Sequence, residues 1–245
     1  MSNWSDPRTT TAAQPAVSVG VPRAARDVGL RSYMLSVYNY MASAVLLTGI
    51  VAYALAASGI AQSIFFGGGI LRYVALFAPL VMVMIMGFRI QRMSTSATQA
   101  FFWAFAVAMG LSMSVIPLIY SGTSIAQTFF ATAAAFLSLS LWGYTTKKDL
   151  SGFGTFLIMG VVGLIVVMIA NLFIRSDALS MVISAIGVLL FAGLTAYDTQ
   201  KIKSMYAHVQ GTDMVGKTAI LGALTLYLDF INMFQFLLAF MGDRR

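Results

Sequence analysis

The feature that most constrains the fold is a series of long apolar segments separated by short basic loops. Each segment holds about 18 residues or more with few charges, which is the length that an α-helix needs to cross a bilayer. Soluble domains carry about a quarter charged residues, whereas this chain of 245 residues is 9% charged and 59% hydrophobic. The sequence therefore predicts an all-α polytopic membrane protein with seven transmembrane helices, at residues 32–57, 70–88, 97–120, 125–144, 153–174, 178–199 and 217–241.

The ends of the chain and the loop charges predict its domains and its orientation. We expect residues 1–30 to form a disordered cytoplasmic tail, residues 31–241 the seven-helix transmembrane domain, and residues 242–245 a short C-terminal tail. Cytoplasmic loops are enriched in Lys and Arg, and here most basic residues fall in the loops on the side of the N-terminus. The N-terminus is therefore predicted to be cytoplasmic and the C-terminus to lie on the far side, unless the last segment re-enters the membrane.

Composition excludes several kinds of site. The chain has no cysteine, which excludes disulfides and thiolate chemistry. The chain has one histidine, His208, which cannot form a multi-histidine metal site. We interpret His208 as a solvated loop residue. The net charge of +7 comes from basic loops between spans, so it indicates membrane topology and not nucleic-acid binding. The last span has no internal lysine, which excludes a retinal Schiff base.

The last apolar segment, residues 217–241, carries a carboxylate near its middle. Thr218, Gly222, Thr225, Asp229 and Asn232 follow one another at alternating steps of four and three, which places them on one face of a helix. A polar stripe of this kind is costly to expose to lipid. We therefore expect the C-terminal helix to be central, with the other six helices wrapped around it.

A second carboxylate, Asp198, lies near the end of the preceding span. Because the two spans are sequence neighbours and antiparallel, Asp198 and Asp229 can reach a similar depth. Two close carboxylates in a low-dielectric environment do not both ionise easily and tend to share a proton. The pair is therefore a candidate proton sensor, or a cation ligand once deprotonated. In the alternative interpretation, Asp198 pairs locally with Lys201, and Asp229 is hydrogen-bonded to Asn232 or to a neighbouring tyrosine.

Two arginines, Arg89 and Arg92, end the second span in the stretch MGFRIQRMS. An arginine at this level is a candidate partner for a carboxylate at the cytoplasmic mouth, where it would hold the helices together as a latch. In the alternative, both arginines merely anchor the span and follow the positive-inside rule.

Four stretches of the chain together carry a resemblance to a known family. They are QAFFWAFAVAMGLSMSVI (99–116), GYTTKKDLSGFG (143–154), FAGLTAYDTQKIK (191–203) and GALTLYLDFINMF (222–234). The chain resembles the Bax inhibitor-1 family, also called the transmembrane Bax inhibitor motif proteins, over about residues 30–241. The likeness is most specific in YDTQKIK and LYLDFIN.

The resemblance implies a bacterial inner-membrane protein that acts as a pH-sensitive calcium leak. In that family an aspartate pair matching Asp198 and Asp229 is the sensor, and an arginine matching Arg89 or Arg92 is the latch. We expect no cofactor, with Ca²⁺ as the permeant ion. The two aspartates would be metal ligands only transiently, supported by Thr225 and Asn232, because Ca²⁺ usually takes six to eight oxygens. Some bacterial relatives are linked to a membrane-bound AAA protease, which is therefore a candidate partner.

Three functions compete at this point. In a pH-gated leak, acid protonates the aspartates, weakens the arginine latch and opens the cytoplasmic mouth. A regulator or scaffold would instead bind a membrane-bound AAA protease without transporting ions, and its effects would survive the loss of both aspartates. An intramembrane aspartyl protease also needs two aspartates. Asp198 lacks a Gly-x-Gly context and no Pro-Ala-Leu follows Asp229, so we do not expect an enzyme.

Overall fold

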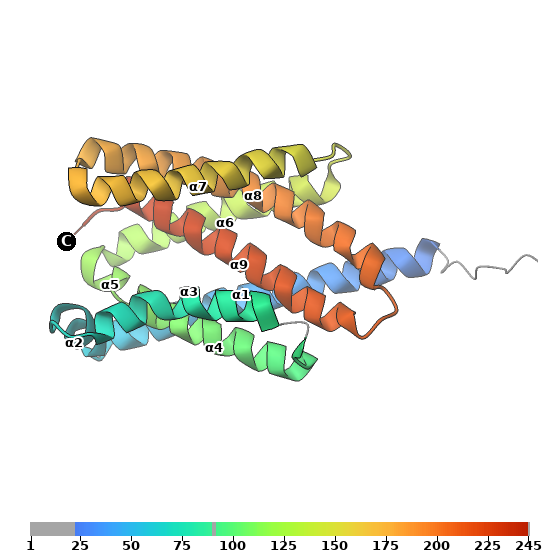
Figure 1. Cartoon of the computed structure of the whole chain (residues 1–245), viewed down its shortest axis with the longest axis horizontal. Helices are drawn as coiled ribbons and strands as arrows, with labels where there is room; N and C mark the ends of the chain where they lie inside the picture. The colour runs from blue at the N-terminus through green and yellow to red at the C-terminus, as the bar shows by residue number, and fades with distance from the viewer. Residues whose placement is uncertain (1–22, 90–91, 245) are drawn as a thin grey trace, which may run out of the picture.

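The computed structural model describes residues 23–89 and 92–244, and Figure 1 shows them as a bundle of roughly aligned helices. Within these ranges seven helices are long and apolar enough to cross a membrane, so the prediction of an all-α protein with seven spans is confirmed. Two short helices, α2 and α5, lie between the long ones. The helices are α1 (Arg23–Ala57), α2 (Ile60–Phe66), α3 (Leu71–Arg89), α4 (Thr95–Met113), α5 (Ile116–Ile119), α6 (Gly122–Thr145), α7 (Ser151–Ile174), α8 (Asp177–Val209) and α9 (Met214–Met241).

Serine residues begin three of the long helices. The side chains of Ser94, Ser121 and Ser176 each accept a hydrogen bond of 3.1–3.2 Å from a backbone N–H three residues ahead. These bonds satisfy N–H groups that have no partner in the first turn of a helix. Pro117 lies in the first turn of α5, where its missing N–H costs nothing, and it divides the third predicted span into α4 and α5.

Two helix boundaries differ from the prediction. Helix α1 begins at Arg23, so residues 23–30 of the predicted tail are helical, whereas residues 1–22 lie outside the described residues. Helix α8 continues to Val209, beyond the apolar limit at residue 199, and His208 lies in its last turn and not in a loop. Hydropathy marks where a segment leaves the membrane, but a helix continues into water wherever other contacts support it.

The C-terminal residues, predicted to be a short tail, are attached to the start of α6. The N–H of Ser121 donates to the carbonyl of Asp243 (3.1 Å), and the N–H of Asp243 donates to the hydroxyl of Ser124 (3.0 Å). The guanidinium of Arg244 lies 5.9 Å from the centre of the Tyr120 ring. Figure 1 shows this end of the chain at the opposite end of the bundle from the start of α1, which agrees with seven complete crossings and not with a re-entrant last segment.

Helix α9 crosses the middle of the bundle obliquely (Figure 1). Half of its most apolar stretch is buried, compared with 11% for α7. It packs against α8, α1, α6 and α4, whereas α3 packs on α4 and α7 packs on α8. The expectation that six helices wrap around α9 is therefore only partly right, because α3 and α7 form an outer layer. Helix α7 is apolar on every side and has no polar stripe that would be costly to expose to lipid.

A hydrogen-bonded group in the core connects α9 to two other helices. The hydroxyl of Thr48 on α1 lies 2.7 Å from the hydroxyl of Tyr227 on α9 and donates to the carbonyl of Ala106 on α4 (3.0 Å). Thr48 and Tyr227 are fully buried. Polar contacts of this kind hold transmembrane helices together where water cannot compete for them, so they fix α9 between α1 and α4.

Candidate functional site

The structure brings Asp198 of α8 and Asp229 of α9 together inside the bundle. Their carboxyl groups lie within hydrogen-bonding reach of each other. Asp198 is 9% exposed and Asp229 is 4% exposed. Helices α8 and α9 follow each other in the chain and pack against each other along their length. The two carboxyl groups therefore form one buried unit between the last two helices.

The burial of Asp229 determines what charge this unit can carry. Its Oδ2 atom is buried and has no hydrogen-bond partner within residues 23–89 and 92–244. A buried carboxylate without partners is costly, and two like charges this close repel each other strongly. A shared proton avoids both costs, because one carboxyl then donates to the other. The geometry therefore favours a pair of aspartates that holds a proton between them.

A lysine on the same helix is a charged neighbour of Asp198. Lys201 follows Asp198 by about one turn of α8, and its charge acts on that carboxyl group. Its Nζ atom lies 5.8 Å from the centre of the Tyr197 ring. Asp198 thus lies between Asp229 and Lys201, and the two alternatives for its partner remain predictions.

The polar side chains predicted to support the pair bond to their own helix. The amide of Asn232 donates to the carbonyl of Leu228 (2.8 Å), and the hydroxyl of Thr225 donates to the carbonyl of Leu221 (3.1 Å). Both side chains are half-buried. Neither bond reaches Asp229, so Asn232 and Thr225 extend the polar stripe of α9 without closing a ligand set around the carboxyl group.

The structure does not bring the two candidate latch arginines to the aspartates. Arg89 ends α3, Arg92 follows two residues that are outside the described ranges, and both side chains are exposed. Within residues 23–89 and 92–244, neither arginine is among the groups in contact with Asp198 and Asp229. Helix α3, which Arg89 ends, packs on α4 in the outer layer.

Two glycines that sequence reasoning missed position α8 at the pair. Gly143 of α6 and Gly154 of α7 contact α8 directly before Asp198. A Cβ atom on Gly143 would lie 2.9 Å from the Cα of Ala196, and one on Gly154 would lie 2.6 Å from Cδ2 of Tyr197. Glycine lets transmembrane backbones approach this closely. The signal was present in the sequence, since these glycines are the first and last of the GYTTKKDLSGFG stretch.

The loop between α6 and α7 is fixed to α8 one turn beyond the glycines. The side chain of Gln200 accepts from the N–H of Leu150 (2.9 Å) and donates to the carbonyl of Lys148 (2.8 Å). The Nζ atom of Lys203 donates to the carbonyl of Tyr144 at the end of α6 (2.7 Å). These bonds join polar side chains of α8 to backbone groups at the end of α6 and in the α6–α7 loop. They support α8 as a helix beyond its apolar part.

An all-helical bundle with seven membrane spans and an aspartate pair buried between its last two helices defines the class of the protein. It is a multi-pass membrane protein with a titratable site inside the membrane. Comparison with known proteins identifies the family. The family model described as "Inhibitor of apoptosis-promoting Bax1" matches residues 30–245. The chain belongs to the Bax inhibitor-1 family.

Bacterial relatives cover almost the whole chain. The inner membrane protein YbhL of Escherichia coli K12 is 42% identical over 230 residues, which are 93% of this chain and 97% of YbhL. An uncharacterized protein of Rickettsia prowazekii is 47% identical over 220 residues, 89% of this chain and 92% of that protein. An uncharacterized protein of Caulobacter vibrioides is 45% identical over 228 residues, 89% of this chain and 91% of that protein. With its seven spans, the chain is thus a multi-pass protein of the bacterial inner membrane.

Proposed function

We propose that this protein is a pH-sensitive cation leak in which the protonation state of Asp198 and Asp229 controls the passage of Ca²⁺. The observation that supports the proposal is the position of the two carboxyl groups, which face each other inside a membrane bundle. Ionisable groups inside a membrane are costly, and they usually mark ion pathways or proton relays. The proposal places the N-terminus and the Lys201 end of the bundle in the cytoplasm, following the loop charges.

The shared proton gives the pair a closed state. With one proton between them, the carboxyl groups of Asp198 and Asp229 attract each other and hold α8 against α9. A second proton removes the negative charge that a latch arginine, Arg89 or Arg92, would need as its partner. Loss of the shared proton leaves two like charges within hydrogen-bonding distance. We expect acid to open the path, because protonation removes the charge that would hold a latch arginine at the pair.

The site suits a passing ion better than a stored one. Ca²⁺ usually takes six to eight oxygen ligands. Within residues 23–89 and 92–244, no group of three His, Cys, Asp or Glu side chains gathers. Two aspartates would therefore hold Ca²⁺ only briefly, with water as most of its remaining ligands. This is the behaviour that a leak requires.

Calcium flux into dye-loaded proteoliposomes at about pH 6, 7 and 8 tests the proposal. The proteins to compare are the wild type, Asp198→Asn, Asp229→Asn and the double variant. Asp177→Asn is the matched control, since Asp177 is an exposed aspartate at the start of the same helix. We expect flux that rises as pH falls in the wild type and in Asp177→Asn, and flux with little pH dependence in both pair variants.

Each other outcome removes a defined part of the proposal. Unchanged flux and pH dependence in Asp229→Asn would refute the aspartate sensor. Flux that rises with pH would make repulsion within the pair the opening step and remove the arginine latch. No flux from any protein would favour the regulator that binds a membrane-bound AAA protease, whose effect on protease turnover would persist in the double variant. Cleavage of a model transmembrane peptide by the wild type alone would indicate an aspartyl protease.

A further inference from the structure

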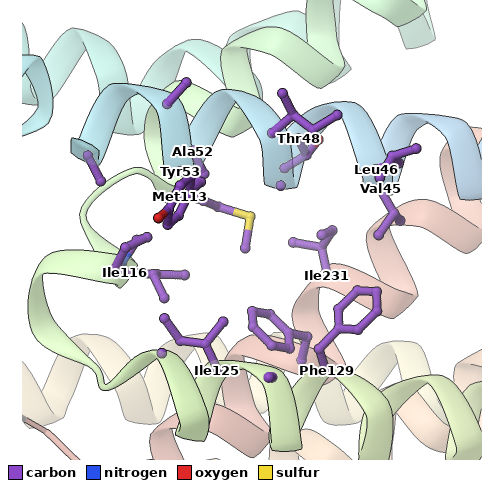
Figure 2. Close-up of a pocket in the computed structure, with 18 of the residues that line it drawn as sticks. Val45, Leu46, Thr48, Ala52, Tyr53, Met113, Ile116, Ile125, Phe129 and Ile231 are labelled. Atoms are coloured by element: carbon purple, nitrogen blue, oxygen red, sulfur yellow. The ribbon is translucent and has the colours of Figure 1, made fainter. Parts of the chain in front are cut away.

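A deep groove lies between α1 and α6, and α9 forms its floor. It consists of two adjoining cavities of about 920 and 830 Å³. The cavities share Val45 and Leu46 on α1, Phe129 on α6 and Phe230 on α9. Figure 2 shows the cavity nearer α5, where side chains from α1 and α6 line opposite walls of a hollow space.

Small residues on the facing walls keep this groove open. Ala42 and Gly49 lie two turns apart on one face of α1, and Ala126 and Ala133 have the same spacing on α6. A Cβ atom on Gly49 would meet no atom within 4 Å, so the wall there borders open space. Both helices also pack on α9, which forms the floor between them. The groove is therefore a feature of the packed bundle.

The two cavities differ in charge, since Arg31 lines one of them. Arg31, Tyr38, Ser140 and Tyr144 line the 830 Å³ cavity, whereas the lining of the 920 Å³ cavity includes no charged residue. The hydroxyl of Tyr38 lies 2.6 Å from that of Ser140, which lies 2.9 Å from the hydroxyl of Thr199 on α8. This chain of hydroxyl groups connects α1, α6 and α8 in the same cavity that Arg31 lines. The groove thus has a cation at one end, hydroxyl groups in both cavities and mostly apolar walls along its length.

More positive charge surrounds the Arg31 end. The Nζ atom of Lys203 lies 4.7 Å from the centre of the Tyr144 ring and bonds to the Tyr144 carbonyl. An anionic group at the mouth of the groove would therefore meet Arg31, with the ammonium group of Lys203 beside the lining residue Tyr144.

The cavity that contains Arg31 is longer than one leaflet of the hydrocarbon core is thick. On α1 the cavity runs from Arg31 to Leu46, which is about 22 Å at the rise of an α-helix. Half of a typical hydrocarbon core is about 15 Å thick. If the headgroup of a lipid lies at Arg31, its acyl chain would therefore extend along the floor of the groove past Phe230.

We propose that the α1–α6 groove binds one anionic glycerophospholipid, with its phosphate at Arg31 and an acyl chain over Phe230. Basic pockets between transmembrane helices are known to receive anionic headgroups, and arginine binds phosphate through paired hydrogen bonds. A helix of another protein fits less well, because an apolar helix would leave the charged and hydroxyl-bearing end without complementary groups. The proposal does not depend on whether the protein conducts ions.

Native mass spectrometry of the full chain, released from nanodiscs of phosphatidylglycerol and phosphatidylethanolamine in equal parts, tests this proposal. We expect the wild type to retain one phosphatidylglycerol in preference to phosphatidylethanolamine. Arg31→Gln should reduce that preference at least about tenfold, as expected for the loss of a hydrogen bond to a charged group. Lys147→Gln is the matched control, since it removes an exposed charge at the same end that does not line the groove.

A second pair of variants tests the apolar part of the groove. Ala42→Phe fills the space beside α6, whereas Ala170→Phe adds the same bulk to an exposed position of α7. We expect Ala42→Phe alone to lower the retention of phosphatidylglycerol. Any one of three results would overturn the proposal. Arg31→Gln and Lys147→Gln could retain phosphatidylglycerol equally, the two phenylalanine variants could retain it equally, or the wild type could retain both lipids without preference. A bound protein or peptide in place of lipid in the wild type would also overturn it.

Discussion

The substitution Gly143→Ala tests whether close packing of α6 on α8 determines the geometry of the aspartate pair. The added Cβ atom would lie 2.9 Å from both the Cα and the carbonyl carbon of Ala196. Carbon atoms in good contact are about 3.5–4.0 Å apart, so α6 and α8 would have to separate by at least roughly 0.6–1.1 Å, and by more because the carbonyl oxygen of Ala196 is the nearest atom. Ala196 lies two positions before Asp198, so the separation would displace the part of α8 that carries the proposed sensor.

Two opposing terms determine the effect on stability. Alanine in a helix is about 0.8–1.0 kcal/mol more favourable than glycine. Overpacking costs about 1–3 kcal/mol, and this clash belongs at the upper end because the obstacle is backbone and not a flexible side chain. We therefore expect Gly143→Ala to lower the free energy of unfolding by about 1–2 kcal/mol.

Gly163→Ala on α7 is the matched control, because its Cβ atom would meet no atom within 4 Å. It carries only the favourable helix term, so the two variants should differ by about 2–3 kcal/mol. For a protein of this size that corresponds to midpoints of thermal unfolding that differ by about 4–12 °C, measured in the same detergent. If Gly143→Ala unfolds at the same temperature as Gly163→Ala, α6 and α8 are not in backbone contact at this level and the argument fails.

Other contacts in the structure give further expected outcomes. Tyr227→Phe removes the hydroxyl bonded to Thr48 and should lower stability by about 1 kcal/mol, seen as a lower midpoint of thermal unfolding; an unchanged midpoint would mean that this bond adds nothing. Gln200→Ala frees two backbone groups of the α6–α7 loop, so hydrogen exchange of the loop amides should become faster. Unaltered exchange would show that the loop is ordered without the hydrogen bonds from Gln200. If Arg89 is the latch, Arg89→Ala should raise calcium flux near pH 8, where the wild type is closed, and Arg92→Ala should not. The reverse result would assign the latch to Arg92, and no effect of either would refute it.

Much of this architecture could be predicted from the sequence, because it depends on one-dimensional properties. The length and apolarity of each segment indicate seven crossings, since the backbone must satisfy its hydrogen bonds within the membrane. The polar stripe through Asp229 indicates a buried last helix, because such a stripe is costly to expose to lipid. The neighbouring antiparallel span carries Asp198, so the meeting of the two carboxyl groups also followed from chain order.

Other features depend on contacts between residues far apart in the chain, and only the tertiary structure decided them. Helix α8 extends to Val209 because its Gln200 bonds to a loop that is about fifty positions earlier. Gly143 matters because the backbone of Ala196 lies against it. The place of α3 in the outer layer leaves Arg89 exposed, although its position in the sequence is that of a candidate latch. Hydropathy and periodicity are properties of single segments, whereas these features arise from the way in which one helix packs on another.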